Sequence, residues 1–180
     1  MSNSRDQELI EQCQQGDRRA LEELLGHYQR PVYNAAFRML GNPQDASDVV
    51  QVVFLKVFEH LDRYNPKYKF FSWIYRIAIN ESINQINRGK REQVLDDAQP
   101  SRERGPAEET EAIVLSKHVQ EALMTLPEDY RTVTVLRHFS ELSYREISEV
   151  LHIPVVTVKS RLYTARQQLK DRLNTREKMS

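Results

Sequence analysis

The chain has 180 residues with 26 basic and 26 acidic side chains, so its formal net charge is zero. This length allows one domain or two small ones, and the low glycine and proline content suits a helix-rich protein. The single cysteine, Cys13, excludes an internal disulfide. The sequence has no run long enough to span a membrane and no basic-then-apolar signal at its start, so we expect a cytoplasmic protein without membrane insertion.

The charges are unevenly distributed along this neutral chain. Residues 63–91 carry seven basic and one acidic side chain, net +6, and residues 155–180 carry seven and two, net +5. The other segments are acidic, with net charges of −4 for 1–62, −5 for 92–112 and −2 for 113–154. Because attraction to phosphate acts within about a Debye length of ~8–10 Å, two local basic patches can still face nucleic acid. The acidic segments are available to cover them.

The first sixty residues predict helices over 6–15, 17–40 and 45–61, with Asp17 and Asp45 as the residues that cap the second and third. Apolar residues occupy more than one face of the third helix. A helix that is apolar most of the way round is either central in a core or shared with a partner protein.

Residues 64–71 read YNPKYKFF, in which aromatic rings are interleaved with lysines. This pattern suits a single-stranded nucleic-acid site, because each unpaired base that stacks on a ring contributes roughly 1–3 kcal/mol and the cations follow the phosphates. Some of these apolar side chains also have core spacing, and we expect Trp73 and Ile77 to be mainly core.

Polar residues then recur at four-residue steps along one face of the following helix, at Arg76, Asn80, Asn84 and Arg88. Such a stripe is often only solvated surface. Asparagine is a poor helix former, however, so two of them in one stripe indicate a use.

An acidic segment at 91–111, with glycine and proline but almost no large apolar residues, predicts a flexible linker. It separates a first domain at 6–90 from a second at 112–174. The predicted fold class is therefore all-α, with two small helical domains.

Residues 142–173 predict a helix-turn-helix. Ser143 and Glu146 have the spacing of a capping box, and His152-Ile153-Pro154 forms the break between the helices. The second helix has one apolar face and one polar, basic face. In DNA-binding proteins of this kind the second helix enters the major groove, although an ordinary helix pair with a solvated face has the same spacing.

These motifs, in this order, resemble the extracytoplasmic-function (ECF) group of sigma factors of bacterial RNA polymerase, which are sigma-E-like members of the sigma-70 superfamily. The resemblance is carried by FFSWIYRIAIN at 70–80, LPEDYR at 126–131 and PVVTVKSR at 154–161. It implies that 6–90 is sigma region 2, which binds core polymerase and reads and melts the minus-ten element. It also implies that 112–174 is region 4, which reads the minus-thirty-five element.

The resemblance implies a role for individual residues in three groups. The polymerase-binding group on the third helix is Asp48, Gln51, Leu55 and Lys56. The minus-ten group, with a loop that receives a flipped base followed by a reading helix, is Tyr64, Lys67, Lys69, Phe70, Arg76, Asn80 and Asn84. The minus-thirty-five group is Thr157, Lys159, Ser160, Tyr163 and Arg166. Catalytic residues, metals and cofactors are not implied.

Three residues depart from the family pattern: Val52 stands where Glu is usual, Val156 where Gly is usual, and Thr164 where a basic residue is frequent. The implied partners are core RNA polymerase, through its beta-prime clamp and beta flap, promoter DNA and an anti-sigma factor. The free protein is expected to be a monomer with a role in stress response.

Two other classes of protein stay open. A dimeric helix-turn-helix regulator with an N-terminal sensor domain would bind duplex DNA without polymerase, but it has no need of the aromatic and basic segment at 64–84. A small enzyme is the other class, yet the five histidines are scattered and no P-loop, nucleophile elbow or metal motif is present.

Overall fold

A computed structural model describes residues 3–95 and 111–177, and every regular element in that part of the chain is helical. The elements are α1 (Asn3–Gln14), α2 (Arg18–Leu40), α3 (Pro43–His60), the short 3-10 helix η1 (Leu61–Arg63), α4 (Phe70–Leu95), α5 (Glu111–Met124), α6 (Glu128–His138), α7 (Tyr144–Leu151) and α8 (Val155–Glu177). The all-α prediction is confirmed. Within the described ranges, no helix combines the length and the apolar character that crossing a membrane requires.

The helix ends show which local predictions were accurate. Asp17 caps α2 as expected, accepting hydrogen bonds from the amides of Arg19 (2.8 Å) and Ala20 (3.3 Å). The predicted cap Asp45 is wrong, because Asn42 caps α3 and accepts from two backbone amides at 2.8 and 3.2 Å. Pro43 fits the first helical position, where no amide proton is needed, so the helix starts two residues earlier than Asp45.

Helix α4 runs to Leu95, so residues 91–95 continue the helix where we expected linker. The rest of the predicted linker, 96–110, lies outside the described residues. The C-terminal helices then begin at Glu111, next to the predicted boundary.

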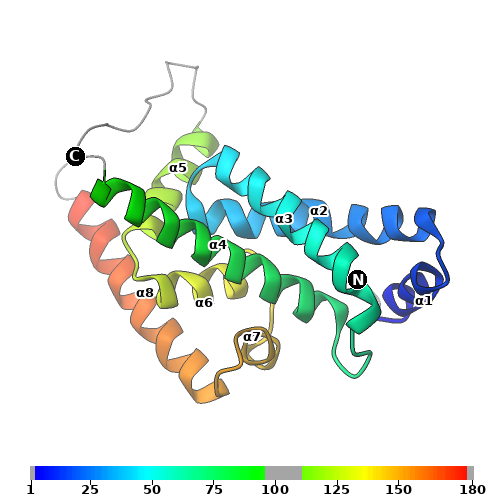
Figure 1. Ribbon diagram of the computed structural model, residues 1–180. Helices are drawn as coiled ribbons and strands as arrows, with labels where there is room; N and C mark the ends of the chain where they lie inside the picture. The colour runs from blue at the N-terminus through cyan, green and yellow to red at the C-terminus, as the bar shows by residue number, and fades with distance from the viewer. Residues whose placement is uncertain (1–2, 96–110, 178–180) are drawn as a thin grey trace.

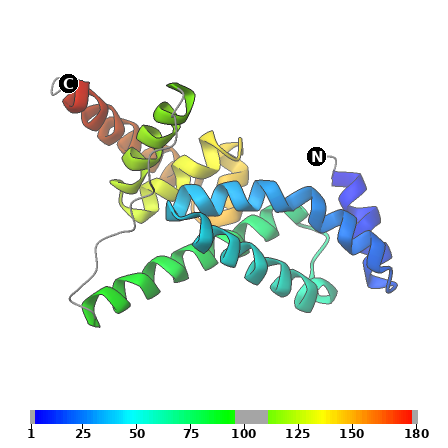
Figure 2. The ribbon, with the colours of Figure 1, turned by 90° about the horizontal axis from the view of Figure 1, so that it is seen from above.

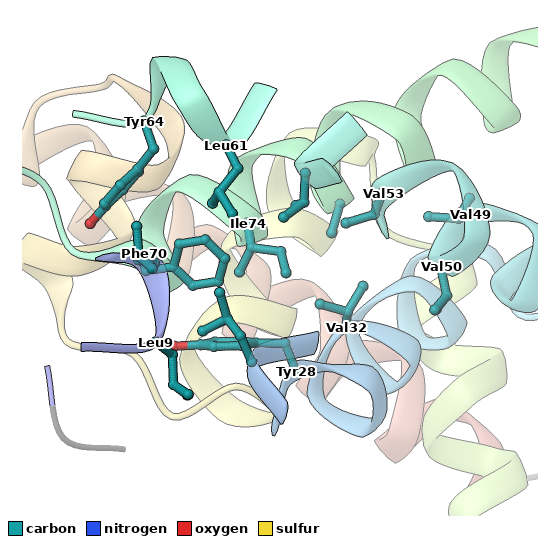
Figure 3. Close-up of a cluster of buried hydrophobic side chains, with 14 of the residues drawn as sticks. Leu9, Tyr28, Val32, Val49, Val50, Val53, Leu61, Tyr64, Phe70 and Ile74 are labelled. Atoms are coloured by element: carbon teal, nitrogen blue, oxygen red, sulfur yellow. The ribbon is translucent and has the colours of Figure 1, made fainter. Parts of the chain in front are cut away.

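Helices α1–α4 with η1, here called the N-terminal unit, enclose one apolar cluster (Figure 3). Tyr28 of α2 meets Phe70 of α4 edge to face, with ring centroids 5.2 Å apart. The Tyr28 hydroxyl donates a 2.6 Å hydrogen bond to Asp6, which ties α1 to α2 through a buried polar pair. Burial is the main reason that the pKa of Tyr28 is raised well above its ordinary value.

Helices α5–α8, here called the C-terminal unit, contain the predicted helix-turn-helix in α7 and α8. The capping box is present, with the Ser143 amide donating to Glu146 at 2.8 Å and the Glu146 amide donating to Ser143 at 3.3 Å. His152 ends α7 in the left-handed conformation at φ 53°, and α8 starts directly after Pro154. The break was therefore placed correctly from sequence.

The two units pack against each other around a second apolar cluster. It combines Ala35, Met39, Tyr75 and Ile79 of the N-terminal unit with buried residues of α6, α7 and α8. Figures 1 and 2 show the C-terminal unit gathered at the C-terminal end of α2, far from α1, with α7 against α4. The sequence predicted two domains, but it contained no signal for this shared cluster.

Candidate nucleic-acid interface

The predicted DNA-reading face of α8 is separated from its core face. Val158, Leu162 and Ala165 are at most 1% exposed. Among the minus-thirty-five candidates, Thr157 in the first turn is half-buried. The other four are exposed: Lys159, Ser160, Tyr163 and Arg166. Four predicted side chains are thereby brought together on one open face of the second helix of the helix-turn-helix.

Two further residues of α8 define this face. Arg161 turns away from it, because its Nη2 atom lies 2.6 Å from the Asp129 carboxylate of α6. Val156, which departs from the family pattern, is 76% exposed one turn before Lys159 and Ser160. An apolar side chain therefore occupies the end of the helix that meets base edges in helix-turn-helix proteins.

The predicted base-stacking loop needs a correction. Tyr64 and Phe70 are 7% and 1% exposed, and their rings pack on each other with centroids 5.6 Å apart. They belong to the core of the N-terminal unit, since apolar rings at helix ends are buried when the unit has space for them. Neither offers a free ring face to a base in this structure.

The exposed ring of the loop is Tyr68, which sequence reasoning missed. It is 57% exposed, between the exposed Lys67 and Lys69. The Tyr64 hydroxyl donates to the Tyr68 carbonyl, so the buried tyrosine positions the backbone that carries the open one. The sequence signal was the second tyrosine of YNPKYKFF, four residues after the first.

The polar stripe of α4 is only partly open. Asn80 and Asn84 are exposed, whereas Arg76 is half-buried. The Arg76 guanidinium donates to the carbonyl oxygens of Glu149 and Val150 in the last turn of α7, the latter at 3.0 Å. The predicted four-residue spacing is correct, but its first residue is engaged by the C-terminal unit.

Lys69 is also engaged by the C-terminal unit, through a 3.2 Å ion pair with Glu146. Partial burial works to raise the pKa of Glu146. Hydrogen bonds from Ser143 and the positive charge of Lys69 outweigh that effect, and the pKa of Glu146 lies below its ordinary value. Glu146 is therefore a stable anion in contact with a predicted DNA-binding lysine.

Apolar residues occupy two sides of α3, and only one of these sides is buried in the core. Val49, Val50, Val53 and Val57 are buried, whereas Val52, Leu55 and Phe58 are 38%, 56% and 65% exposed. The polymerase-binding candidates Asp48, Gln51 and Leu55 lie on the exposed side. The fourth candidate, Lys56, is half-buried and points toward α4, where its amine forms a 2.5 Å ion pair with Glu81.

Among the described residues, no group of three or more histidine, cysteine, aspartate or glutamate side chains is arranged to hold a metal ion. The open faces are instead polar and basic on α8 and α4, and apolar with acidic and amide groups on α3. Exposed faces of this kind, which extend over several helical turns, are typical of surfaces that bind macromolecules.

Two family models match separate parts of the chain. Residues 24–92 match Sigma-70 region 2, and residues 116–169 match Sigma-70, region 4. The ECF RNA polymerase sigma factor SigW of Bacillus subtilis (strain 168) is 34% identical over 177 residues, covering 91% of this chain and 94% of that protein. The ECF RNA polymerase sigma-E factor of Escherichia coli (strain K12) is 33% identical over 180 residues, covering 93% and 94%.

Solved structures share the arrangement of both units. CnrH, solved in complex with the cytosolic domain of CnrY, superposes with a TM-score of 0.73 at 25% identity, covering 95% of this chain and 98% of that chain. The sigma factor RpoE of Bartonella quintana, solved with the anti-sigma factor NepR, has the same fold with a TM-score of 0.72 at 23% identity, covering 85% and 96%. The motif order, the helix-turn-helix and the full-length similarity agree, and the chain belongs to the ECF group of RNA polymerase sigma factors.

Proposed function

We propose that the three exposed faces of this sigma factor carry three separate tasks. The outer face of α3 binds core RNA polymerase, α4 with its preceding loop reads and melts the minus-ten element, and α8 reads the minus-thirty-five element. In domain terms, 6–90 acts as region 2, 91–111 as the linker and 112–174 as region 4. The polymerase supplies the catalytic chemistry.

The observation that carries this proposal is that one chain presents two separate exposed polar faces of different chemistry, one on α8 and one on α4 with its preceding loop. The α8 face has cations, hydroxyls and an exposed tyrosine on the second helix of a helix-turn-helix, which suits duplex DNA. The α4 face and its loop have Asn80, Asn84 and the Tyr68 ring flanked by lysines, which suits unpaired bases. A dimeric duplex reader needs only the first face.

The polymerase-binding part of the proposal rests on α3. Leu55 and Phe58 are more than half exposed on the turn beside Gln51, and large exposed apolar side chains grouped on one helix indicate a protein interface. We assign Asp48 and Gln51 to its polar rim. Lys56 can contact the polymerase from this face only when its amine leaves Glu81 or binds Glu81 and the polymerase together.

The proposal includes a protein that holds the factor inactive by covering these faces, as the family resemblance implies. CnrH, which shares 25% identity and the arrangement of both units, was solved with the cytosolic domain of CnrY bound to it. The free factor is then a cytoplasmic monomer that acts once this partner is released.

The experiment that tests the function is run-off transcription from a pool of genomic promoters, with core RNA polymerase from a related bacterium and with or without this protein. New start sites that share two spaced sequence motifs are expected. If the protein gives no new starts and shifts duplex DNA as a dimer by itself, the polymerase-dependent function is wrong.

Two substitutions separate the two DNA faces. Lys159→Ala should reduce use of the upstream element and leave polymerase binding intact, with Lys170→Ala, exposed farther along the same helix, as the matched control. Loss of polymerase binding by Lys159→Ala would contradict the assignment of α8.

Asn80→Ala should impair transcription from a duplex promoter and spare a promoter already melted around the minus-ten element. Asn34→Ala, an exposed asparagine on α2, is the control and should affect neither template. Equal loss of activity on both templates would place the contact after opening and remove Asn80 from melting.

A further inference from the structure

The basic segment 63–91 contains a single acidic residue, Glu81. It lies on α4 between Asn80 and Asn84, the two exposed asparagines that we assign to the minus-ten element. A carboxylate at this position repels DNA phosphates unless its charge is neutralised. The contacts of Glu81 show how that charge is neutralised and what the carboxylate does beside the asparagines.

Lys56 of α3 neutralises the carboxylate. Its Nζ atom lies 2.5 Å from Oε1 of Glu81, and the Glu81 side chain is only 16% exposed. A close ion pair that is largely shielded from water holds the carboxylate in one place and reduces its repulsion of nearby phosphates. Glu81 is therefore fixed against α3 and costs little in DNA binding.

The same Oε1 atom also contacts Asn84, one turn farther along α4. The Asn84 amide nitrogen Nδ2 donates to it at 3.4 Å. An ionised carboxylate only accepts hydrogen bonds, so the amide must turn its NH2 group toward Glu81. The opposite orientation would bring two oxygens with negative partial charge together. The amide oxygen of the exposed Asn84 is thus directed away from Glu81.

We propose that Glu81 is a positioning residue for minus-ten recognition, which orients the Asn84 amide so that its oxygen faces the DNA. That oxygen accepts a hydrogen bond, and the matching partner is an unpaired base with an exocyclic amine, such as adenine or cytosine. Glu81 acts through Asn84 and does not contact the base. This inference rests on the proposed role of α4 and adds the residue that sets its base preference.

A second contact between the same two helices provides a matched control. Gln85, in the next turn of α4, donates to Oδ1 of Asp45 in α3 at 3.2 Å. Both side chains are half-buried, and neither belongs to the minus-ten group. Asp45→Asn therefore alters a carboxylate that joins α3 to α4 without changing a hydrogen-bond partner of Asn84.

Transcription from promoters that carry base analogues measures the preference. On a promoter identified by run-off transcription, each adenine of the non-template minus-ten strand is replaced in turn by purine and each cytosine by pyrimidin-2-one, which lack the exocyclic amine. With core polymerase and the wild-type protein, loss of the amine at one position should lower initiation by about tenfold, as expected for one hydrogen bond. Asn84→Ala should abolish this dependence and so identify the position that Asn84 contacts.

Glu81→Gln tests the positioning. A glutamine amide presents either an oxygen or an NH2 group, so both orientations of Asn84 become accessible and the amine dependence should fall to about threefold. Asp45→Asn should keep the dependence at about tenfold. In the double variant Glu81→Gln/Asn84→Asp, the new glutamine donates to the new aspartate, whose second oxygen still faces the DNA, so the dependence should return. Each value is a ratio within one protein, so a change in overall activity cancels.

The outcomes separate this inference from the function on which it rests. Full amine dependence in Glu81→Gln, at the position where Asn84→Ala abolishes it, would overturn the proposal and leave the minus-ten role of Asn84 intact. An equal loss in Asp45→Asn would reduce Glu81 to a packing contact, and failure of the double variant to restore the dependence would also contradict the proposal. If the wild-type protein depends on no amine, or Asn84→Ala keeps the dependence, both the reading role of Asn84 and this inference are wrong.

Discussion

Replacing Arg131 tests how the C-terminal unit is held together. The side chain is 9% exposed and donates three hydrogen bonds to carbonyl oxygens, to Met39 at 2.7 Å, to Leu126 at 3.1 Å and to Met124 at 3.2 Å. Burial lowers the pKa of Arg131, but arginine remains charged in proteins, so this cation depends on its three acceptors.

The expected loss of stability follows from these contacts. A hydrogen bond from a charged group contributes about 1.5–3 kcal/mol, and a carbonyl left without a partner in the interior costs about 1–3 kcal/mol. Removing the cation also removes its own desolvation penalty, which offsets part of this loss. We therefore expect Arg131→Ala to lower the free energy of unfolding by about 2–4 kcal/mol.

Thermal and urea unfolding followed by circular dichroism measure this quantity. A loss of 2–4 kcal/mol corresponds to a decrease of about 4–16 °C in Tm for a chain of this size. Arg145→Ala, at an exposed position of α7, is the control and should change stability by less than about 0.5 kcal/mol. If Arg131→Ala loses less than about 1 kcal/mol, the three hydrogen bonds do not stabilise the unit as argued.

Three further predictions concern Val156, Val52 and Tyr28. The exposed Val156 isopropyl group can contact a thymine methyl in the major groove. Replacing thymine by uracil in the minus-thirty-five element should therefore weaken DNA binding by the wild-type protein by about 1 kcal/mol in a competition assay. The same replacement should weaken DNA binding by the Val156→Gly variant by less. Val52→Glu restores the residue that is usual in the family and adds a polar contact beside exposed Leu55, so it should strengthen binding to core polymerase by about tenfold in a competition assay; unchanged affinity would remove Val52 from the interface. Tyr28→Phe leaves the buried Asp6 carboxylate without its donor and should lower the free energy of unfolding by about 1–3 kcal/mol in urea. Because the pKa of Tyr28 is raised above its ordinary value of 10.0, wild-type stability should also fall above about pH 10 more steeply than that of Tyr28→Phe.

The features that sequence reasoning identified correctly are set by neighbouring residues. The capping box needs only Ser143 and Glu146, three residues apart, and the break at Pro154 follows from the missing amide proton of proline. The open face of α8 follows from helical periodicity, since an apolar stripe fixes which side is buried. The same local reasoning gave the wrong cap for α3, because Asn42 and Asp45 are both residue types that cap helices well. Pro43, which favours the first position of a helix, makes Asn42 the cap.

The features that were missed depend on residues far apart in sequence. Whether an aromatic ring near a helix start is buried or open depends on the space between packed helices. Tyr64 and Phe70 fill that space, and Tyr68 does not. The capture of Arg76 by α7, 73 residues away, depends on how two units meet and has no signature in either segment. The alternation of charge along the chain was a signal only for ion pairs between the units, such as Lys69 with Glu146.

Releasing the polar contacts between the two units leaves the hydrogen bonds within each unit in place. Glu146 uses Oε2 to accept the Ser143 amide and Oε1 to accept Lys69, so releasing the lysine leaves the capping box intact. Of the three hydrogen bonds of Arg131, only the one to Met39 crosses to the other unit. The polar contacts across the boundary can therefore be exchanged for water at little cost.

The apolar cluster resists separation of the two units. Opening returns Tyr75, Ile79 and their partners to water at about 25 cal/mol for each Å² of apolar surface exposed, and water or phosphate does not compensate for that loss. The shared cluster is therefore the main contact that holds the two units together.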